Sequence, residues 1–483
     1  MWSSFAYHEP TSTQIVILLS FLLFLNLGGA VAQRYISAGL LGQIFVGIVY
    51  GTPLAGILEE SWEEAIVAIG YVGLLLVVFE GGMSSSISNL RSLLPLSLAI
   101  ALTGLLAPIA LSFILIPLGP SPPLHAFAAG SALSSTSLGT VLAVLHPATI
   151  GFDLRKTALG TALLSAAVMD DIVAFILVKV LTILGSGEQM SGSYLGKSIA
   201  RAVGVTIGLG LVMVVMARWV LKPGYAAVKS SQRLMNATWG GQGFLLVLMA
   251  ILFIGMVAAA GYGGTSPLFG AYIAGLAIAY LSDSDSPDTD REAGVIELDK
   301  TCLPSGLGSR RNTFPTTARP LAMGASSTAL ARSDSIVPPV AGLIETFEHY
   351  IAPVLTYLLL PLFFGSIGYS IPFVPLWTGR VIWRGIIYAL LMFLGKGFCG
   401  AWMLLRGRKG WRAVMLLGLA MVSRGEIGLL IAQVARGTSD PLLDEDEFLV
   451  VVWAIVLCTI VGPASVGWAV NRWKKRILRG GWD

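Results

Sequence analysis

The chain has 483 residues, of which 55% are hydrophobic and only 12% are charged. A soluble domain carries about twice that charged fraction, so this composition excludes a soluble globular protein. The formal net charge of +4 gains meaning only from its distribution along the chain. Apolar stretches cover most of the length, and the short alternating strands of an outer-membrane barrel are not seen. The composition therefore predicts an all-α polytopic membrane protein.

Apolar runs bounded by charged residues or by Gly, Pro and Ser clusters predict about thirteen transmembrane helices. They lie near residues 12–32, 37–56, 63–83, 92–117, 122–147, 157–184, 198–220, 242–261, 264–282, 345–374, 380–405, 411–436 and 447–471. The first run follows a start without Lys or Arg, whereas a cleaved secretory signal has a basic beginning. We therefore expect this run to be retained as the first helix.

The charged residues predict the orientation of these helices. One set of alternate loops carries most of the Lys and Arg, with clusters at 406–412 and 472–479. The opposite loops contain acidic runs at 59–64 and 444–447. Because basic loops stay in the cytosol, this asymmetry places the N-terminus outside or in a lumen and the C-terminus in the cytosol. No sorting pattern distinguishes the plasma membrane from the membrane of an organelle.

The membrane region is interrupted once. Residues 1–282 form a first part with about nine helices, and residues 342–471 form a second part with about four. Between them, residues 283–341 are polar and rich in Ser, Pro, Gly and Arg. That composition predicts a disordered loop on the cytoplasmic side. Residues 472–483 form a basic cytoplasmic tail that suits anionic lipid headgroups.

Two adjacent aspartates, Asp170 and Asp171, lie in the middle of the apolar run 161–178. A carboxylate at the centre of a membrane helix costs about 2.5–3.5 kcal/mol on insertion scales, which is tolerated when it binds or carries something. Successive helical positions point about 100° apart, so the two side chains do not face each other as a proton-sharing pair. We expect one to meet a mobile cation and the other a fixed positive charge.

Lys396, in the eleventh predicted span, is the candidate for that fixed charge. It lies between glycines in LeuGlyLysGlyPheCysGly (394–400), which would let another helix approach closely. Its side chain could instead extend toward the cytosol. Pairing with a carboxylate is the favoured interpretation, because ionisable groups inside membranes usually pair with one another.

Two predicted spans carry polar interruptions. The fifth contains SerSerThrSer (134–137) followed by LeuGly, and the twelfth contains SerArgGlyGlu (423–426). Hydroxyl groups and glycine supply oxygens and points where a helix can unwind. Arg424 and Glu426 are assigned a mainly structural role, the neutralisation of half-helix ends on either side of a break at Gly425.

The interrupted spans are seven apart and therefore cross the membrane in opposite directions. Such matching interruptions indicate an inverted-repeat transporter, with spans four to six and eleven to thirteen as the two repeats. Glu80, near the cytoplasmic end of the third span, is interpreted as an interfacial charge.

Seven short segments, in this order, give the chain a family resemblance. They are PheGluGlyGly (79–82), SerSerThrSerLeuGly (134–139), AspAsp (170–171), GlyThrSerProLeuPheGlyAlaTyrIleAlaGly (264–275), ProLeuPhePheGlySerIleGly (361–368), GlyLysGlyPheCysGly (395–400) and SerArgGlyGluIleGlyLeu (423–429). The chain resembles the cation:proton antiporter superfamily, and most of all the electrogenic sodium/proton antiporter-like branch with paired aspartates, of the Na⁺/H⁺ exchanger type.

The resemblance implies a fold, an assembly and roles for residues. It implies a homodimer in the lipid bilayer, with a dimerisation domain and a core domain in which two discontinuous helices cross. Asp171 would carry the ion and the proton, and Asp170 would pair with Lys396. Thr136 and Ser135 would lie nearby on the unwound segment. The long loop departs from compact bacterial relatives, and the lack of a large C-terminal nucleotide-binding domain departs from the ligand-gated potassium efflux branch.

We therefore expect a secondary active antiporter, and not an enzyme. It would exchange Na⁺ or K⁺, or Li⁺, for protons by alternating access, with a transient cation at Asp171. No cofactor, resident metal or nucleic-acid partner is expected. The alternatives are a passive cation channel or a proton-coupled transporter of another solute. An intramembrane aspartyl protease ranks far below, because both aspartates share one predicted helix.

Overall fold

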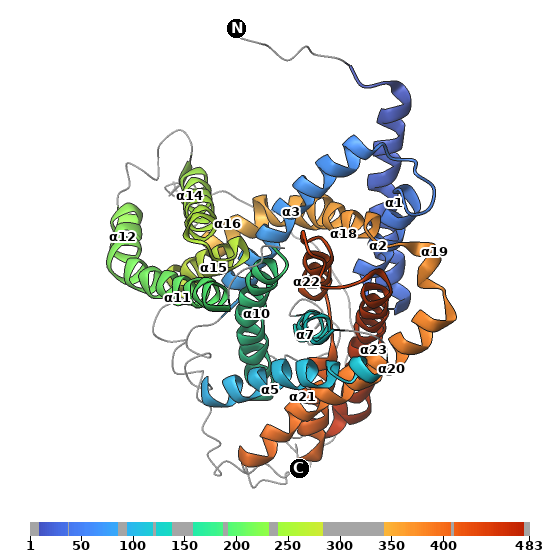
Figure 1. The fold of residues 1–483 in the computed structure, drawn as a ribbon. Helices are drawn as coiled ribbons and strands as arrows, with labels where there is room; N and C mark the ends of the chain where they lie inside the picture. The colour runs from blue at the N-terminus through green and yellow to red at the C-terminus, as the bar shows by residue number, and fades with distance from the viewer. Residues whose placement is uncertain are drawn as a thin grey trace, which may run out of the picture.

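The computed structural model contains helices, joined by turns and loops, and no strands over the residues it describes (Figure 1). These residues are 9–36, 38–85, 94–118, 122–137, 158–186, 192–230, 240–283, 342–406 and 410–477. The prediction of an all-α membrane protein is confirmed for this part of the chain.

The longer helices follow the predicted spans closely. They are α1 (Ser12–Ile36), α2 (Gly39–Tyr50), α3 (Glu60–Met83), α5 (Leu94–Ser112), α7 (Pro123–Ala132), α10 (Ala158–Leu184), α11 (Gly192–Met216), α14 (Gly240–Gly263), α15 (Pro267–Asp283), α18 (Leu360–Tyr369), α20 (Gly379–Gly397), α21 (Trp411–Val422), α22 (Glu426–Arg436) and α23 (Glu445–Ile477). Short helical pieces extend or connect them: α6 (Leu115–Leu118), η2 (Ala217–Leu221), α12 (Lys222–Ser230), α16 (Leu343–Tyr350), α17 (Ala352–Val354), η4 (Leu355–Leu359), α19 (Phe373–Leu376) and η5 (Phe398–Arg406).

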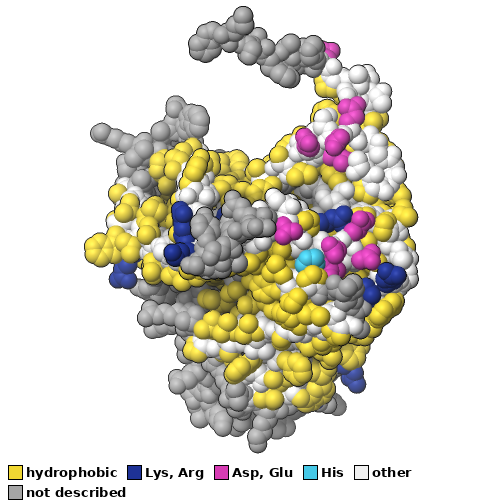
Figure 2. Space-filling model, in the orientation of Figure 1, with side chains coloured by type: hydrophobic (Ala, Val, Ile, Leu, Met, Phe, Trp, Pro, Cys, Tyr) yellow, Lys and Arg dark blue, Asp and Glu magenta, His cyan; other side chains and the backbone are white. Residues whose placement is uncertain are grey.

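Eight of the described helices are long and apolar enough to cross a membrane, or nine if the bent pair α21 and α22 is one span. The predicted number of thirteen spans is therefore not confirmed. Hydrophobic side chains cover much of the face in Figure 2. In the helix that begins with α11, only 17% of the most apolar 18-residue stretch is buried, compared with 61% of the corresponding stretch in α23. Exposed apolar helices of this kind need a lipid solvent.

The helices form two bundles. In the first bundle, α18 packs against α2 and α3, and α1 and α15 pack beside them. The close contacts depend on glycine: a Cβ added to Gly47 of α2 would lie 2.1 Å from the carbonyl oxygen of Gly365 in α18. Small residues let membrane helices approach in this way, which replaces the hydrophobic driving force that lipid does not supply.

In the second bundle, α7 and α22 lie at the centre, and α5, α10, α20, α21 and α23 surround them (Figure 1). The two bundles meet where α18 approaches α22 and where α15 approaches α10. The second bundle contains all of the residues that the sequence places in the ion site.

Both predicted interruptions coincide with the ends of helices. Helix α7 ends at Ala132, and residues 133–137 are not helical. Residues 138–147 of the same predicted span lie outside the described residues. Residues 423–425 separate α21 from α22, whose axes differ by 41°. Gly425 has an extended backbone with φ −163° and ψ −145°.

Other boundaries differ from the sequence prediction. The predicted span 345–374 is divided into α16, α17, η4 and α18, with proline in the first turns of α17 and α18, where a proline fits a helix start. Helix α23 continues to Ile477, so the predicted tail begins as part of the last helix. Residues 478–483, and the predicted loop 283–341 apart from Asp283, lie outside the described residues.

Candidate ion-binding site

The two interrupted segments touch each other at the centre of the second bundle. The main-chain N–H of Ser137 donates to the carbonyl oxygen of Ser423 at 3.0 Å. Thr136 Oγ1 donates to the carbonyl oxygen of Met421 at 3.4 Å. Each segment therefore satisfies backbone groups that the other leaves without helical partners, which allows non-helical backbone inside the membrane.

Arg424 links the same segments by its side chain. It is fully buried, and its Nη1 donates to the carbonyl oxygen of Ser135 at 2.5 Å. The carbonyl oxygen of Arg424 accepts a hydrogen bond from Thr459 Oγ1 of α23 at 3.1 Å. A guanidinium in this place offers positive charge to carbonyl oxygens at the end of an interrupted helix. The structural role that the sequence predicted for Arg424 stays a prediction.

The interruption at 423–425 depends on two glycines. A Cβ on Gly425 would lie 2.5 Å from Ser137 Oγ, and a Cβ on Gly462 of α23 would lie 2.8 Å from Ser423 Cα. Glycine at these positions lets one backbone approach another more closely than any larger residue would.

A buried ion pair lies beside this crossing. Lys396 Nζ of α20 donates to Asp170 Oδ2 of α10 and to Thr136 Oγ1, both at 2.8 Å. Both charged side chains of the pair are 0% exposed. Lys396 thus pairs with a carboxylate and does not extend toward solvent. Gly104 of α5 makes room for it, since an added Cβ would lie 3.0 Å from Lys396 Nζ.

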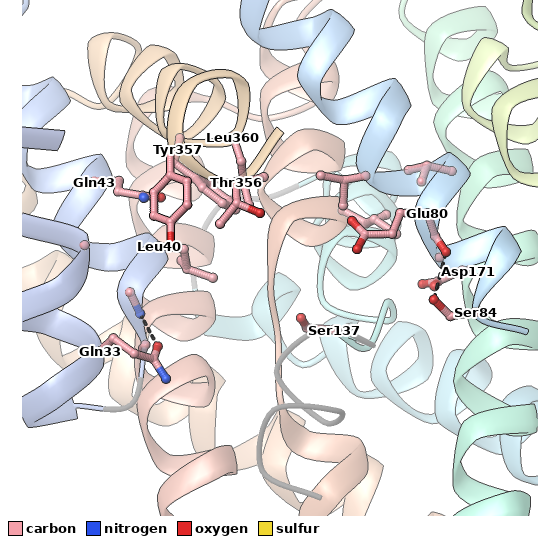
Figure 3. Close-up of a pocket in the computed structure, with 18 of the residues that line it drawn as sticks. Gln33, Leu40, Gln43, Glu80, Ser84, Ser137, Asp171, Thr356, Tyr357 and Leu360 are labelled. Carbon is pink, nitrogen blue, oxygen red and sulfur yellow. Dashed lines mark hydrogen bonds between the residues drawn. The ribbon is translucent and has the colours of Figure 1, made fainter. Parts of the chain in front are cut away.

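Asp171 faces a different environment. It is 6% exposed and lines a cavity of about 730 Å³. Figure 3 shows Asp171, Ser137 and Glu80 around this space, with Gln33, Gln43 and Tyr357 across it. The cavity lies between the two bundles, because its lining comes from α1, α2, α3 and α18 of the first and from α10 and α22 of the second.

The predicted site residues differ in their surroundings. One buried cluster contains Asp170, Lys396 and Thr136, whereas Asp171 lies at the cavity. Ser135 is buried and contributes its carbonyl oxygen to Arg424. Glu426 is the first residue of α22, and its side chain lies outside the described part of the chain.

Most of the cavity-lining residues were not assigned to the site from sequence, among them Ser137, Tyr272 and Glu80. Each of these three occurs in one of the segments that carry the family resemblance, but no periodicity shows which residues of such a segment face a cavity. Glu80 was interpreted as an interfacial charge, and the structure places it at the same cavity as Asp171. Tyr272 is buried, and its hydroxyl lies 3.2 Å from Ser85 Oγ.

Interrupted membrane helices that meet beside a buried carboxylate, next to a cavity between two bundles, define an ion-coupled secondary transporter. Residues 17–293 and 340–472 match the family described as "Sodium/hydrogen exchanger, transmembrane". The chain belongs to this family.

Relatives are similar over nearly the whole chain. The Na⁺/H⁺-K⁺ antiporter GerN of Bacillus cereus is 25% identical, with 92% of each chain covered. The probable Na⁺/H⁺ antiporter GerT of the same organism is 25% identical over 90% of this chain and 93% of its own. The fold is similar to that of the sodium proton antiporter MjNhaP1 from Methanocaldococcus jannaschii, with a TM-score of 0.61 at 14% identity, over 95% of this chain and 98% of that one.

Proposed function

We propose that this chain exchanges a monovalent cation, Na⁺ or K⁺, for protons across a membrane by alternating access, with Li⁺ as a further candidate cation. The family, and the antiport activity for which GerN and GerT are named, support cation/proton antiport. The observation that carries the proposal is the position of Asp171. It is a nearly buried carboxylate that borders a cavity, directly beside two interrupted helices.

Competition at Asp171 supplies the coupling. A carboxylate in a low-dielectric environment is stabilised when either a proton or a metal cation neutralises its charge. Once one of them is bound, the affinity for the other is lost. Carboxylate and hydroxyl oxygens are suitable ligands for small cations, and Ser137 lines the same cavity. A cation arriving at Asp171 therefore displaces a proton, and a proton displaces the cation.

Movement of the second bundle against the first would expose Asp171 to the other side. The cavity between the bundles supports this division, with the second bundle as the core domain. An empty, charged Asp171 would be costly to carry past apolar walls, whereas a neutralised one is not. Only loaded forms then cross, which keeps the exchange coupled.

The Asp170–Lys396 pair would set the charge that moves in each cycle. Besides its bond to Asp170, the Lys396 ammonium group donates a hydrogen bond to Thr136 Oγ1. The ion pair is therefore linked to the non-helical segment 133–137. A proton leaving Lys396 or Asp170 during the cycle would make the exchange electrogenic. Lys396→Gln then alters the charge carried per cycle, and a voltage-dependent flux measurement tests this.

We further propose a homodimer in the lipid bilayer, with the first bundle as the dimerisation domain. The N-terminus would lie outside or in a lumen, and the C-terminus in the cytosol, as the basic residues predict. The protein would carry out transport and no covalent reaction.

The direct test uses proteoliposomes with an imposed pH gradient and a fluorescent pH indicator. Adding Na⁺, K⁺ or Li⁺ in separate experiments should dissipate the gradient and rank the three ions. Clamping the membrane potential at zero with an ionophore distinguishes the rival channel, because a channel moves cations without a proton in return. Cation flux that persists without any change in the pH gradient would overturn the proposal.

A further inference from the structure

A histidine and two carboxylates meet at the N-terminal ends of two helices, away from the ion site. His125 lies in the first turn of α7, Glu447 lies in the first turn of α23, and Asp444 directly precedes α23. His125 Nδ1 is 2.7 Å from Glu447 Oε2. One possible ligand atom from each of the three residues lies within 4.8 Å of the others. Among the described residues, no other group of three His, Cys, Asp or Glu side chains has its possible ligand atoms this close together.

We propose that His125, Asp444 and Glu447 form a binding site for a divalent transition-metal ion of the Zn²⁺ type. One imidazole nitrogen and two carboxylate oxygens are a ligand set that Zn²⁺ and its first-row neighbours accept. The mixed set distinguishes this group from the exposed acidic residues around it, because imidazole is a poor ligand for Ca²⁺ or Mg²⁺.

Two of the three ligands are already held in place. His125 and Glu447 are each only 16% exposed. Glu447 Oε2 also accepts a hydrogen bond from the main-chain N–H of Asp444 at 3.1 Å. This bond holds the Glu447 carboxylate beside Asp444 at the start of α23. With Zn–ligand bonds of about 2.0–2.1 Å, the three donor atoms must lie roughly 3–3.5 Å apart. The His125–Glu447 hydrogen bond of 2.7 Å would therefore open slightly, and the Asp444 carboxylate would move closer to both. The exposed Asp444 side chain can rotate to complete that geometry.

The ion would connect the helices that support both interruptions of the ion site. Helix α7 is followed directly by residues 133–137, and Gly462 of α23 packs closely against the backbone of Ser423. A metal bridge between the ends of α7 and α23 would stabilise the second bundle against unfolding, by mass action. The proposed orientation places these helix ends outside or in the lumen, so that compartment would supply the ion.

The test uses the purified full-length chain in detergent, with any polyhistidine tag removed and Zn²⁺ as the probe. Calorimetric titration should give one saturable site per chain, and saturating Zn²⁺ should raise the Tm. His125→Ala and Asp444→Asn should each weaken Zn²⁺ binding by about tenfold or more and abolish the Tm increase. Because Asp444 is exposed, its substitution tests the site without disturbing packing.

Matched controls lie close by. His349→Ala removes another described histidine, which is exposed. Asp446→Asn removes a carboxylate two residues from Asp444. The Asp446 carboxylate is exposed and lies 3.9 Å from Arg380 Nη1. Both controls, and Asp171→Asn, should bind Zn²⁺ like the unmodified chain. No saturable binding below about 1 mM Zn²⁺, or binding that persists in both His125→Ala and Asp444→Asn, would overturn the proposal.

Discussion

Two consecutive residues of one helix have opposite surroundings. Asp170 is fully buried and its carboxylate accepts a hydrogen bond from Lys396 at 2.8 Å. Asp171 borders a cavity of about 730 Å³. The difference follows from the helix itself, because neighbouring positions point about 100° apart. The Asp170 carboxylate is paired with a cationic side chain of the protein, whereas the Asp171 carboxylate borders the cavity in which we propose that a mobile cation binds.

The two positions are expected to respond differently to substitution. Removing either member of a buried ion pair leaves an uncompensated charge, which destabilises the fold. A carboxylate at a cavity must be compensated by whatever enters. Substitutions of Asp170 or Lys396 should therefore affect stability most, and substitutions of Asp171 should affect transport most.

The largest expected effect is that of Asp171→Asn. The amide can neither release a proton nor bind a cation by charge, so cation-dependent proton movement in proteoliposomes should fall by about 10²-fold or more. The Tm of the variant should stay near that of the unmodified chain, because Asp171 lies at a cavity. Exchange at the normal rate in Asp171→Asn would contradict the assignment of this residue as the carrier.

The next effect concerns the Asp170–Lys396 pair. Asp170→Asn and Lys396→Met each leave one buried charge without its partner, and each should lower the free energy of unfolding by about 3–5 kcal/mol. The double variant removes both charges and should recover most of that loss. Chemical unfolding in detergent measures all three. If the losses of the single variants simply add in the double variant, the two groups do not act as a pair.

A smaller effect is expected at the glycine contacts of α23. Gly462→Ala would place a Cβ 2.8 Å from the backbone of Ser423, so the interruption must shift. Overpacking of this kind costs about 1–3 kcal/mol, and we expect a lower Tm and slower transport. Gly467→Ala, in the same helix, has open space around it and should change neither. Equal behaviour of the two variants would show that the Gly462 contact is unimportant.

The smallest effect should come from Ser137→Ala. Ser137 lines the cavity with Asp171, and one hydroxyl ligand is worth about 0.5–1.5 kcal/mol. That corresponds to an increase of about 2- to 10-fold in the apparent KM for the cation, with the Tm nearly unchanged. Transport assays across a range of cation concentrations measure it. An unchanged KM would remove Ser137 from the ion pathway.

Much of the fold could be predicted from the sequence, because membrane helices are long apolar runs whose ends are marked by charge and glycine. The interruptions at 133–137 and 423–425 could be found for the same reason, since hydroxyl groups and Gly425 stand out inside apolar segments. The division at 350–360 was missed, because prolines in the first turn of a short helix do not lower the hydropathy of a span.

That one of the two aspartates pairs with Lys396 could be proposed from charge, because few ionisable groups lie at membrane depth. The choice of Asp170 as that partner came from the family resemblance. The cavity could not be predicted from the sequence. Its walls come from helices far apart in the chain, and residues such as Gln33, Gln43 and Tyr357 have no sequence pattern that marks them as facing Asp171. Which serine of 134–137 lines the cavity also depends on the non-helical backbone, whose directions follow no fixed period.

The most direct test of the central claim is the pH dependence of the apparent cation KM of the unmodified chain in proteoliposomes. Competition between a proton and a cation for Asp171 predicts that the KM rises as the pH falls, approaching about tenfold per pH unit in the acidic range. The maximal rate should be reached again at sufficiently high cation concentration. A cation KM that does not change with pH, while transport itself continues, would contradict the account.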